Sequence, residues 1–275
     1  MAVTMAEITH LRKMSGAGMM DCKHALEEAD HDFEKAMEII RKKGQVVAAK
    51  RSDREASEGC VLAAVEEGFA AIVALKCETD FVAKNEQFIA LTKDILDLAM
   101  AKKPASLAAL LAEKMDKEGR SVQDHITDRI GVTGEKIELG YYEFLKADTA
   151  AFYVHPGNKL ATIVAFNKPA DKTVMHEVAM QVAAMAPVSV RPEEVPAKIL
   201  DEEKEIARDK AREAGKPENL IDRIVEGALQ KYYKENTLLL QEFVKDNKIN
   251  IGQYLKQHDK ELTVAAFKRV TLNME

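Results

Sequence analysis

Apolar residues at the start of the chain recur at the spacing of short amphipathic helices, with polar residues between them. The pattern predicts three helices and stops at Gly44, which we expect to cap the third helix at its carboxyl end. The polar segment 45–58 is typical of a linker, so the bundle is expected to be an arm that can move. The three helices are read from 8–14, from Cys22, Ala25, Leu26 and Ala29, and from Phe33, Ala36, Met37 and Ile40.

A unit of two strands and a helix occurs twice in the rest of the chain. The first copy has apolar strands at 61–65 and 69–76, and the second has strands at 151–155 and 160–166. The helices that follow have the same apolar spacing, with Phe88, Leu91, Ile95 and Leu98 in the first and Met175, Val178, Val182 and Met185 in the second. The junction between strand and helix is four positions longer in the first copy.

The remaining segments predict an α+β fold, because strands at 136–145 and 263–272 would complete two antiparallel three-stranded sheets. Flanking helices are predicted at 106–118, at 122–130 and from Asn250 to 256, and two charged helices around Gly215 predict a projecting helical hairpin. We expect an N-terminal helical module with a basic linker at 1–54, a first core subdomain at 55–147, and a second at 148–275 that carries the hairpin at 197–233.

The long junction of the first copy places an acid beside a large aromatic residue. Asp80 and Phe81 follow the end of a strand and precede a helix. One interpretation is ordinary: Asp80 caps the helix and Phe81 folds back onto the core. Capping alone does not account for the extra positions, so we favour the alternative, in which the pair is presented outward at a tip.

Composition narrows the class of protein. The chain has 275 residues, 47% of them hydrophobic and 31% charged, which suffices for a sizeable core. No apolar run reaches membrane-spanning length and the N-terminus lacks the apolar stretch of a secretion signal, so we expect no membrane association and a cytoplasmic location. Cys22, Cys60 and Cys77 are odd in number and widely spaced, which favours reduced thiols over disulfides.

Neither an enzyme nor a nucleic-acid-binding protein fits the sequence well. It contains no Walker-type loop, no zinc-ligand spacing and no GxSxG, so no catalytic residue, metal or cofactor is expected. The net charge of −6 disfavours direct binding of nucleic acid. A basic run within 41–54 either stays hydrated, which is the commoner case, or meets an acidic partner.

Two separated motifs carry a resemblance to a known family. The first runs from Leu11 through Ser15-Gly16-Ala17-Gly18-Met19-Met20-Asp21-Cys22-Lys23 to Leu26, and the second is Thr79-Asp80-Phe81-Val82-Ala83. Together they resemble bacterial translation elongation factor Ts over nearly the whole chain. The resemblance implies a UBA-like N-terminal module, a duplicated core and a coiled coil. It further implies a nucleotide-exchange factor, and no enzyme, that binds elongation factor Tu in its GDP-bound and nucleotide-free forms.

The resemblance also assigns roles to individual residues. Asp80 and Phe81, flanked by Thr79 and Val82, resemble a pair that pushes between helices of the GTPase near its magnesium site. Further contacts with the GTPase are implied for Arg12, Met19, Met20, Lys23 and His155. From the residues alone, the two methionines could equally fill a small core, and His155 reads as structural or solvent-facing.

The sequence departs from part of this family at its end. Some members continue into a further helix that grips elongation factor Tu, whereas this chain ends at Glu275, just after the last predicted strand. We expect that contact to be absent. Either the remaining surface suffices, or the helical hairpin and a homodimer make up the difference.

Overall fold

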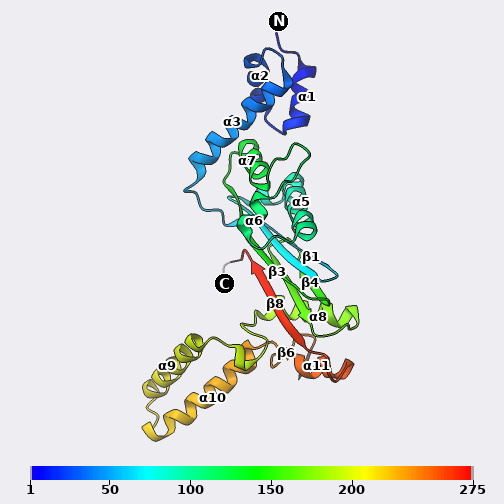
Figure 1. Cartoon of the computed structure of the whole chain (residues 1–275). Coiled ribbons are helices and arrows are strands. Elements are labelled where there is room, and N and C mark those ends of the chain that lie inside the picture. Colours follow the sequence, from blue (N-terminus) through cyan, green and yellow to red (C-terminus); the bar gives the residue numbers. More distant parts are fainter. Residues whose placement is uncertain (1, 274–275) are drawn as a thin grey trace.

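The computed structural model describes residues 2–273 and confirms a mixed α+β fold with antiparallel three-stranded sheets. A helical bundle lies at one end of the molecule, a helical hairpin projects at the other, and two sheets with their helices lie between them (Figure 1). Residues 1 and 274–275 lie outside the described residues. They belong to the predicted N-terminal module at 1–54 and to the predicted second core subdomain at 148–275.

The N-terminal bundle consists of three helices, as the apolar spacing predicts. They are α1 (Met5–Ser15), α2 (Met19–Glu28) and α3 (Phe33–Arg51). Thr4 begins α1 with a capping box that includes Glu7, and the carboxylate of Asp32 accepts hydrogen bonds from the first turn of α3. Leu11, Cys22 and Leu26 are fully buried where the helices meet, so these side chains form the core of the bundle.

The predicted end of the third helix is wrong, because α3 continues through Gly44 to Arg51. Gly44 is buried where α3 crosses α7 (Val122–Thr133), and it faces Gly131. A Cβ atom on Gly131 would lie 2.7 Å from the Cα of Gly44, closer than real contacts allow. Gly44 therefore permits close helix packing and caps nothing, and the irregular connection to the first strand covers only 52–57.

The core contains two antiparallel sheets, each with three strands. The first has the order β1-β2-β3, and the second has the order β4-β5-β8. The strands are β1 (Glu58–Glu66), β2 (Phe69–Cys77), β3 (Ile137–Leu145), β4 (Ala150–Val154), β5 (Leu160–Phe166) and β8 (Val264–Thr271). The bounds of the predicted strands lie within three residues of these. In each sheet the central strand is the second strand of the repeated hairpin.

The two sheets pack face to face, and helices cover their outer faces. Alternate residues of the central strands, such as Ile72 and Ile163, are fully buried between the sheets. The residues between them point the other way and pack against helices. The first sheet is covered by α5 (Glu86–Lys102), α6 (Leu107–Ala112) and α7, and the second by α8 (Lys172–Met185) and α11 (Ile251–His258). This double packing explains why both central strands are apolar almost throughout.

Three details differ from the sequence prediction. The helix expected at 106–118 is only α6, because Lys114 pairs with Ser121 in an isolated bridge. Met185, expected on the apolar face of α8, is exposed in its last turn. Two short strands that the pattern did not indicate, β6 (Glu242–Phe243) and β7 (Asp246–Asn250), precede α11.

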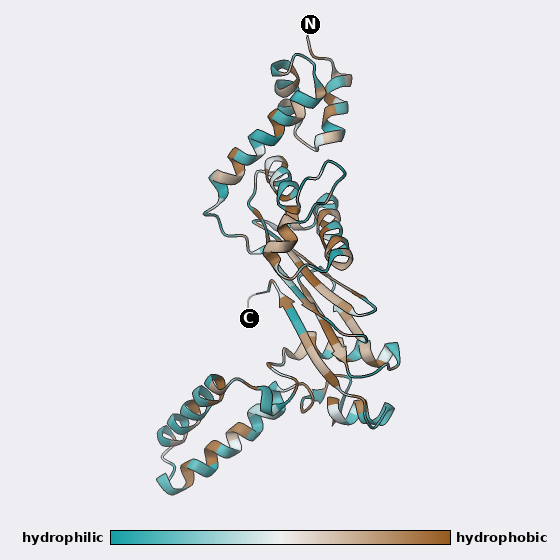
Figure 2. Cartoon of the chain, in the orientation of Figure 1, coloured by the Kyte–Doolittle hydropathy of each residue, from teal (hydrophilic) through white to brown (hydrophobic). Residues whose placement is uncertain are grey.

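The helical hairpin consists of α9 (Ala197–Glu213) and α10 (Glu218–Asn236), and a 3₁₀ turn at Pro192–Glu194 precedes it. The two helices pack against each other through a small hydrophobic cluster that is separate from the main core. It consists of Ala207, Ala211, Ile221 and Val225. In Figure 2 the hydrophobic colour is concentrated on the strands, whereas much of the hairpin is hydrophilic. None of the described helices is long and apolar enough to cross a membrane.

The sheet-to-sheet contact should dominate stability. We expect Ile163→Ala to lower the free energy of unfolding by about 2–5 kcal/mol, because it leaves a cavity between the sheets. Ile206→Ala is the matched control, since Ile206 is 44% exposed on α9, and it should cost less than about 0.5 kcal/mol. Urea denaturation measures both values. Equal costs would contradict this description of the core.

Candidate interaction site

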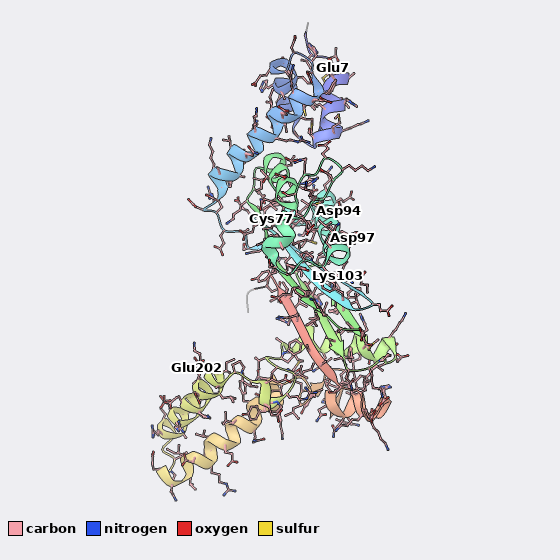
Figure 3. The ribbon with its side chains drawn as sticks, viewed as in Figure 1. Glu7, Cys77, Asp94, Asp97, Lys103 and Glu202 are labelled. Atoms are coloured by element: carbon pink, nitrogen blue, oxygen red, sulfur yellow. The ribbon has the colours of Figure 1, made fainter. Side chains whose placement is uncertain are left out.

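The longer junction of the first copy forms a short helix at the end of the first sheet. β2 ends at Cys77, which Figure 3 labels, and α4 (Asp80–Ala83) follows. The Thr79 hydroxyl caps α4 by accepting a hydrogen bond from the Val82 amide, and Asn85 caps α5 by accepting bonds from the amides of its first turn. The interpretation of Asp80 as the N-cap is therefore wrong, because its neighbour Thr79 has this role.

The exposed side chain of α4 is aromatic. Phe81 is 84% exposed, whereas Ala83 is buried and Val82 packs against the core of the first sheet. Phe81 therefore does not fold back onto the core, contrary to the ordinary interpretation. A benzyl group held so far into solvent gains little from the fold of the chain itself, which makes Phe81 a candidate for contact with a partner.

Asp80 is ionised beside this ring. Its carboxylate accepts a hydrogen bond from the Lys84 ammonium at 2.6 Å, one turn further along the chain, and its side chain is 44% exposed. The hydrogen bond from Lys84 lowers the pKa of Asp80, and the charges of Lys84 and Lys159 lower it further. At neutral pH this short helix therefore carries an ionised carboxylate, paired with Lys84, next in sequence to the exposed ring of Phe81.

Two glutamates fix the backbone of the tip. The carboxylate of Glu135 accepts hydrogen bonds from the Thr79 amide at 3.0 Å and from the Thr79 hydroxyl at 2.6 Å. The Glu78 carboxylate accepts a hydrogen bond from the Lys136 amide at 2.7 Å. It accepts a longer hydrogen bond, at 3.3 Å, from the Arg51 guanidinium. The segment before α4 is thus bonded to the start of β3, and the end of α3 is bonded to the same segment.

A buried thiol adds one more bond to this anchor. The Cys77 thiol donates to the Thr79 carbonyl oxygen at 3.2 Å. Burial raises the pKa of Cys77 to about 12 and that of Cys60 to about 11, so both groups remain neutral thiols. All three cysteines are free and buried in the structure.

His155 lies in a turn at the same end of the core as the tip. The turn follows β4, and its Asn158 carbonyl oxygen accepts the Val61 amide at 2.7 Å. Lys159 forms an ion pair with Glu58 at 2.8 Å, at the start of β1. The imidazole of His155 is exposed, and its Nδ1 is hydrogen-bonded to the Tyr153 hydroxyl at 2.9 Å. The turn of the second copy therefore lies against the strand that begins beside the tip.

The predicted contact residues of the N-terminal module lie at its surface. Met19 is 46% exposed and Met20 is 57% exposed, so the interpretation that they fill a small core is wrong. Arg12 is exposed, and Lys23 is half-buried and lies 3.7 Å from Glu27 in an ion pair. Methionines exposed next to each other on one helix are typical of adaptable protein contacts.

Sequence reasoning missed the residues that hold the tip, namely Arg51, Glu78 and Glu135. Glu135 lies 56 positions from Thr79, and only the pairing of β2 with β3 brings them together.

The structure indicates no metal site: within residues 2–273, no group of three or more histidine, cysteine or acidic residues is arranged to hold an ion.

Comparison with known proteins agrees with the motifs. A family model described as elongation factor TS matches residues 78–274. Proteins named elongation factor Ts from Porphyromonas gingivalis and from Azobacteroides pseudotrichonymphae are 66% and 56% identical, and each match covers 100% of both chains. The protein of that name from Christiangramia forsetii is 46% identical over 98% of both chains. The chain therefore belongs to the elongation factor Ts family, whose members act in translation elongation.

The anchor of the tip can be tested in the isolated protein. We expect Glu135→Ala to speed amide hydrogen exchange at residues 82–84 about tenfold or more, because hydrogen bonds to a charged acceptor contribute on the order of 1.5–3 kcal/mol. Glu67→Ala, an exposed acid at the opposite end of the β1–β2 hairpin, is the control and should leave these amides unchanged. Unaltered exchange in Glu135→Ala would show that the tip is held by other contacts.

Proposed function

We propose that this protein is a guanine-nucleotide exchange factor for the translational GTPase elongation factor Tu in the cytoplasm. It binds the GDP form, speeds the release of GDP and leaves a nucleotide-free complex that GTP can enter. Family membership supports this role in general terms. The observation that carries the detailed mechanism is the exposed ring of Phe81 on an anchored tip.

Phe81 acts as a wedge. Its ring is almost fully in solvent in the free protein, so burial in an apolar slot of the partner contributes about 2–3 kcal/mol. Because Glu135 already fixes Thr79, little additional ordering of the backbone is needed when the ring enters. A ring of this kind is typical of the few residues that dominate an interface.

Asp80 acts on the partner's magnesium site. Its carboxylate is ionised at neutral pH, and the hydrogen bond from Lys84 lowers its pKa further below the usual range. A negative charge that enters beside the bound magnesium ion disturbs the water ligands of that ion. Because the affinity for the diphosphate depends on the ion, the affinity falls. No covalent bond is made or broken. Thr79 and Val82 support the pair from either side.

The remaining contacts extend the interface. Arg12, Met19, Met20 and Lys23 touch the GTPase domain from the N-terminal module, and His155 approaches its phosphate-binding region from the second sheet. Exposed methionines on α2 and an exposed imidazole beside the tip end of the core support these assignments. The two methionines supply apolar area that adapts to the partner's shape.

Exchange of this kind is reciprocal. If the factor weakens nucleotide affinity, then nucleotide weakens the affinity of the factor by the same ratio, at about 1.4 kcal/mol for each tenfold change. The factor therefore has no means of selecting GTP by itself. The direction of exchange follows from the nucleotide concentrations and from whatever captures the GTP form.

We expect Phe81→Ala to slow the release of a fluorescent GDP analogue from elongation factor Tu by about thirtyfold, the equivalent of a contact worth about 2 kcal/mol. Stopped-flow fluorescence at a factor concentration below saturation measures the rate. Tyr141→Ala is the matched control, since it removes another exposed ring, in the middle of β3. Release that is as fast with Phe81→Ala as with the wild type would contradict the wedge.

A further inference from the structure

Three residues of the basic run form ion pairs within the molecule, and all three lie on α3. Arg41 pairs with Glu118 in the loop before α7, and Arg51 pairs with Glu78 beside the tip. Lys43 pairs with Asp21 on α2, and this pair joins two helices of the N-terminal module. These three charges, out of a run that was expected either to stay hydrated or to meet a partner, thus connect α3 to elements on both sides of it.

The backbone of α3 also contacts the backbone of α7. The room for a side chain at each glycine shows how close the helices come: a Cβ atom on Gly44 would lie 3.2 Å from the Thr127 carbonyl oxygen, and one on Gly131 would lie 2.7 Å from the Cα of Gly44. Gly131 has no room for a side chain, and a side chain on Gly44 would require the backbone of α7 to shift. A contact between two backbones is rigid, because it leaves no flexible side chain to rearrange.

The turn between α1 and α2 lies near the core as well. A Cβ atom added to Gly16 in this turn would lie 3.8 Å from atoms of Gln87 and Val132. Gln87 in turn accepts a hydrogen bond from Arg129 at 2.7 Å. Gln87 lies in the first turn of α5, directly after the tip. The module therefore contacts the core along α3, and its α1–α2 turn, just before Met19, lies close to the first turn of α5.

We propose that α3 is a strut that holds the Met19–Met20 surface at a fixed position relative to Phe81, so that the two form one preorganised surface for a GTPase partner. Gly131 is then a positioning residue, although it touches no partner. This proposal rests on the exchange function proposed above. Two contacts held at a fixed spacing bind with higher avidity than two joined by a flexible linker, because binding of the first aligns the second.

The geometry can be tested without a partner. Spin labels can be attached at His24→Cys on α2 and Glu86→Cys on α5, which are both exposed positions. Pulsed electron paramagnetic resonance then measures the distance between the two labels, and so between the module and the start of α5. The natural cysteines are buried and do not compete for the label. We expect one narrow distance distribution, which broadens when Gly131→Leu is added. Gly227→Leu, at a helical glycine with open space around it, is the control and should leave the distribution narrow.

The functional consequence is a coupling between distant residues. In the wild-type background, Met19→Ala with Met20→Ala should weaken binding to GDP-bound elongation factor Tu at least tenfold. In the Gly131→Leu background, the same pair should cost less than threefold, because the module is no longer aligned. Arg41→Ala with Arg51→Ala, which removes two ion pairs and leaves the glycine crossing intact, should reduce the coupling less.

Two results would overturn the strut. One is a distance distribution that is already broad in the wild-type background, and the other is an equal cost of the methionine substitutions in both backgrounds. Phe81→Ala in the GDP-release assay described above separates this failure from a failure of the exchange function. If Phe81→Ala still slows GDP release while the coupling is absent, the factor exchanges nucleotide with an independently moving module. If Phe81→Ala also has no effect, the exchange mechanism itself is wrong.

Discussion

The hydrogen bonds from Thr79 to Glu135 are the constraint on which the account depends. They hold the backbone just before α4, and the four residues of α4 then direct Val82 and Ala83 inward and Phe81 outward. A flexible loop with the same sequence could bury its phenylalanine in its own core. Because the anchor is formed in the free protein, the backbone that carries the exposed ring is already ordered, and the proposed binding would lose less conformational entropy.

The elements that the sequence predicted well are those in which one local period decides the structure. The alternation and apolar content of the hairpin strands indicated β1, β2, β4 and β5, and the spacing that starts at Phe88 indicated α5. The extra positions before Phe88 indicated a feature that the second copy lacks, and α4 occupies them. Comparing the two copies was more informative than either copy alone. Both copies need the same hairpin and helix for packing, so the extra junction residues of the first copy must have another role.

What the sequence could not predict depends on contacts between distant segments. A glycine at the end of an apolar helical pattern usually caps the helix, so the sequence around Gly44 predicts a cap. Only the contact with Gly131 on another helix reveals its role. The two methionines on α2 fit a core or a surface equally well until the burial of Leu11 and Leu26 shows that the core is already filled. Glu135 carries no motif, and β-sheet register alone brings it to Thr79.

The most direct test of the central claim is site-specific photocrosslinking from position 81. A benzophenone amino acid in place of Phe81 keeps an aromatic group at the tip, and the same group in place of Leu220 on α10 serves as the control. The account predicts that position 81 crosslinks to the GTPase domain of elongation factor Tu, in peptides that flank its magnesium ligands, and that position 220 does not. Crosslinks from position 81 that are absent, or that fall only in another domain of the partner, would contradict it.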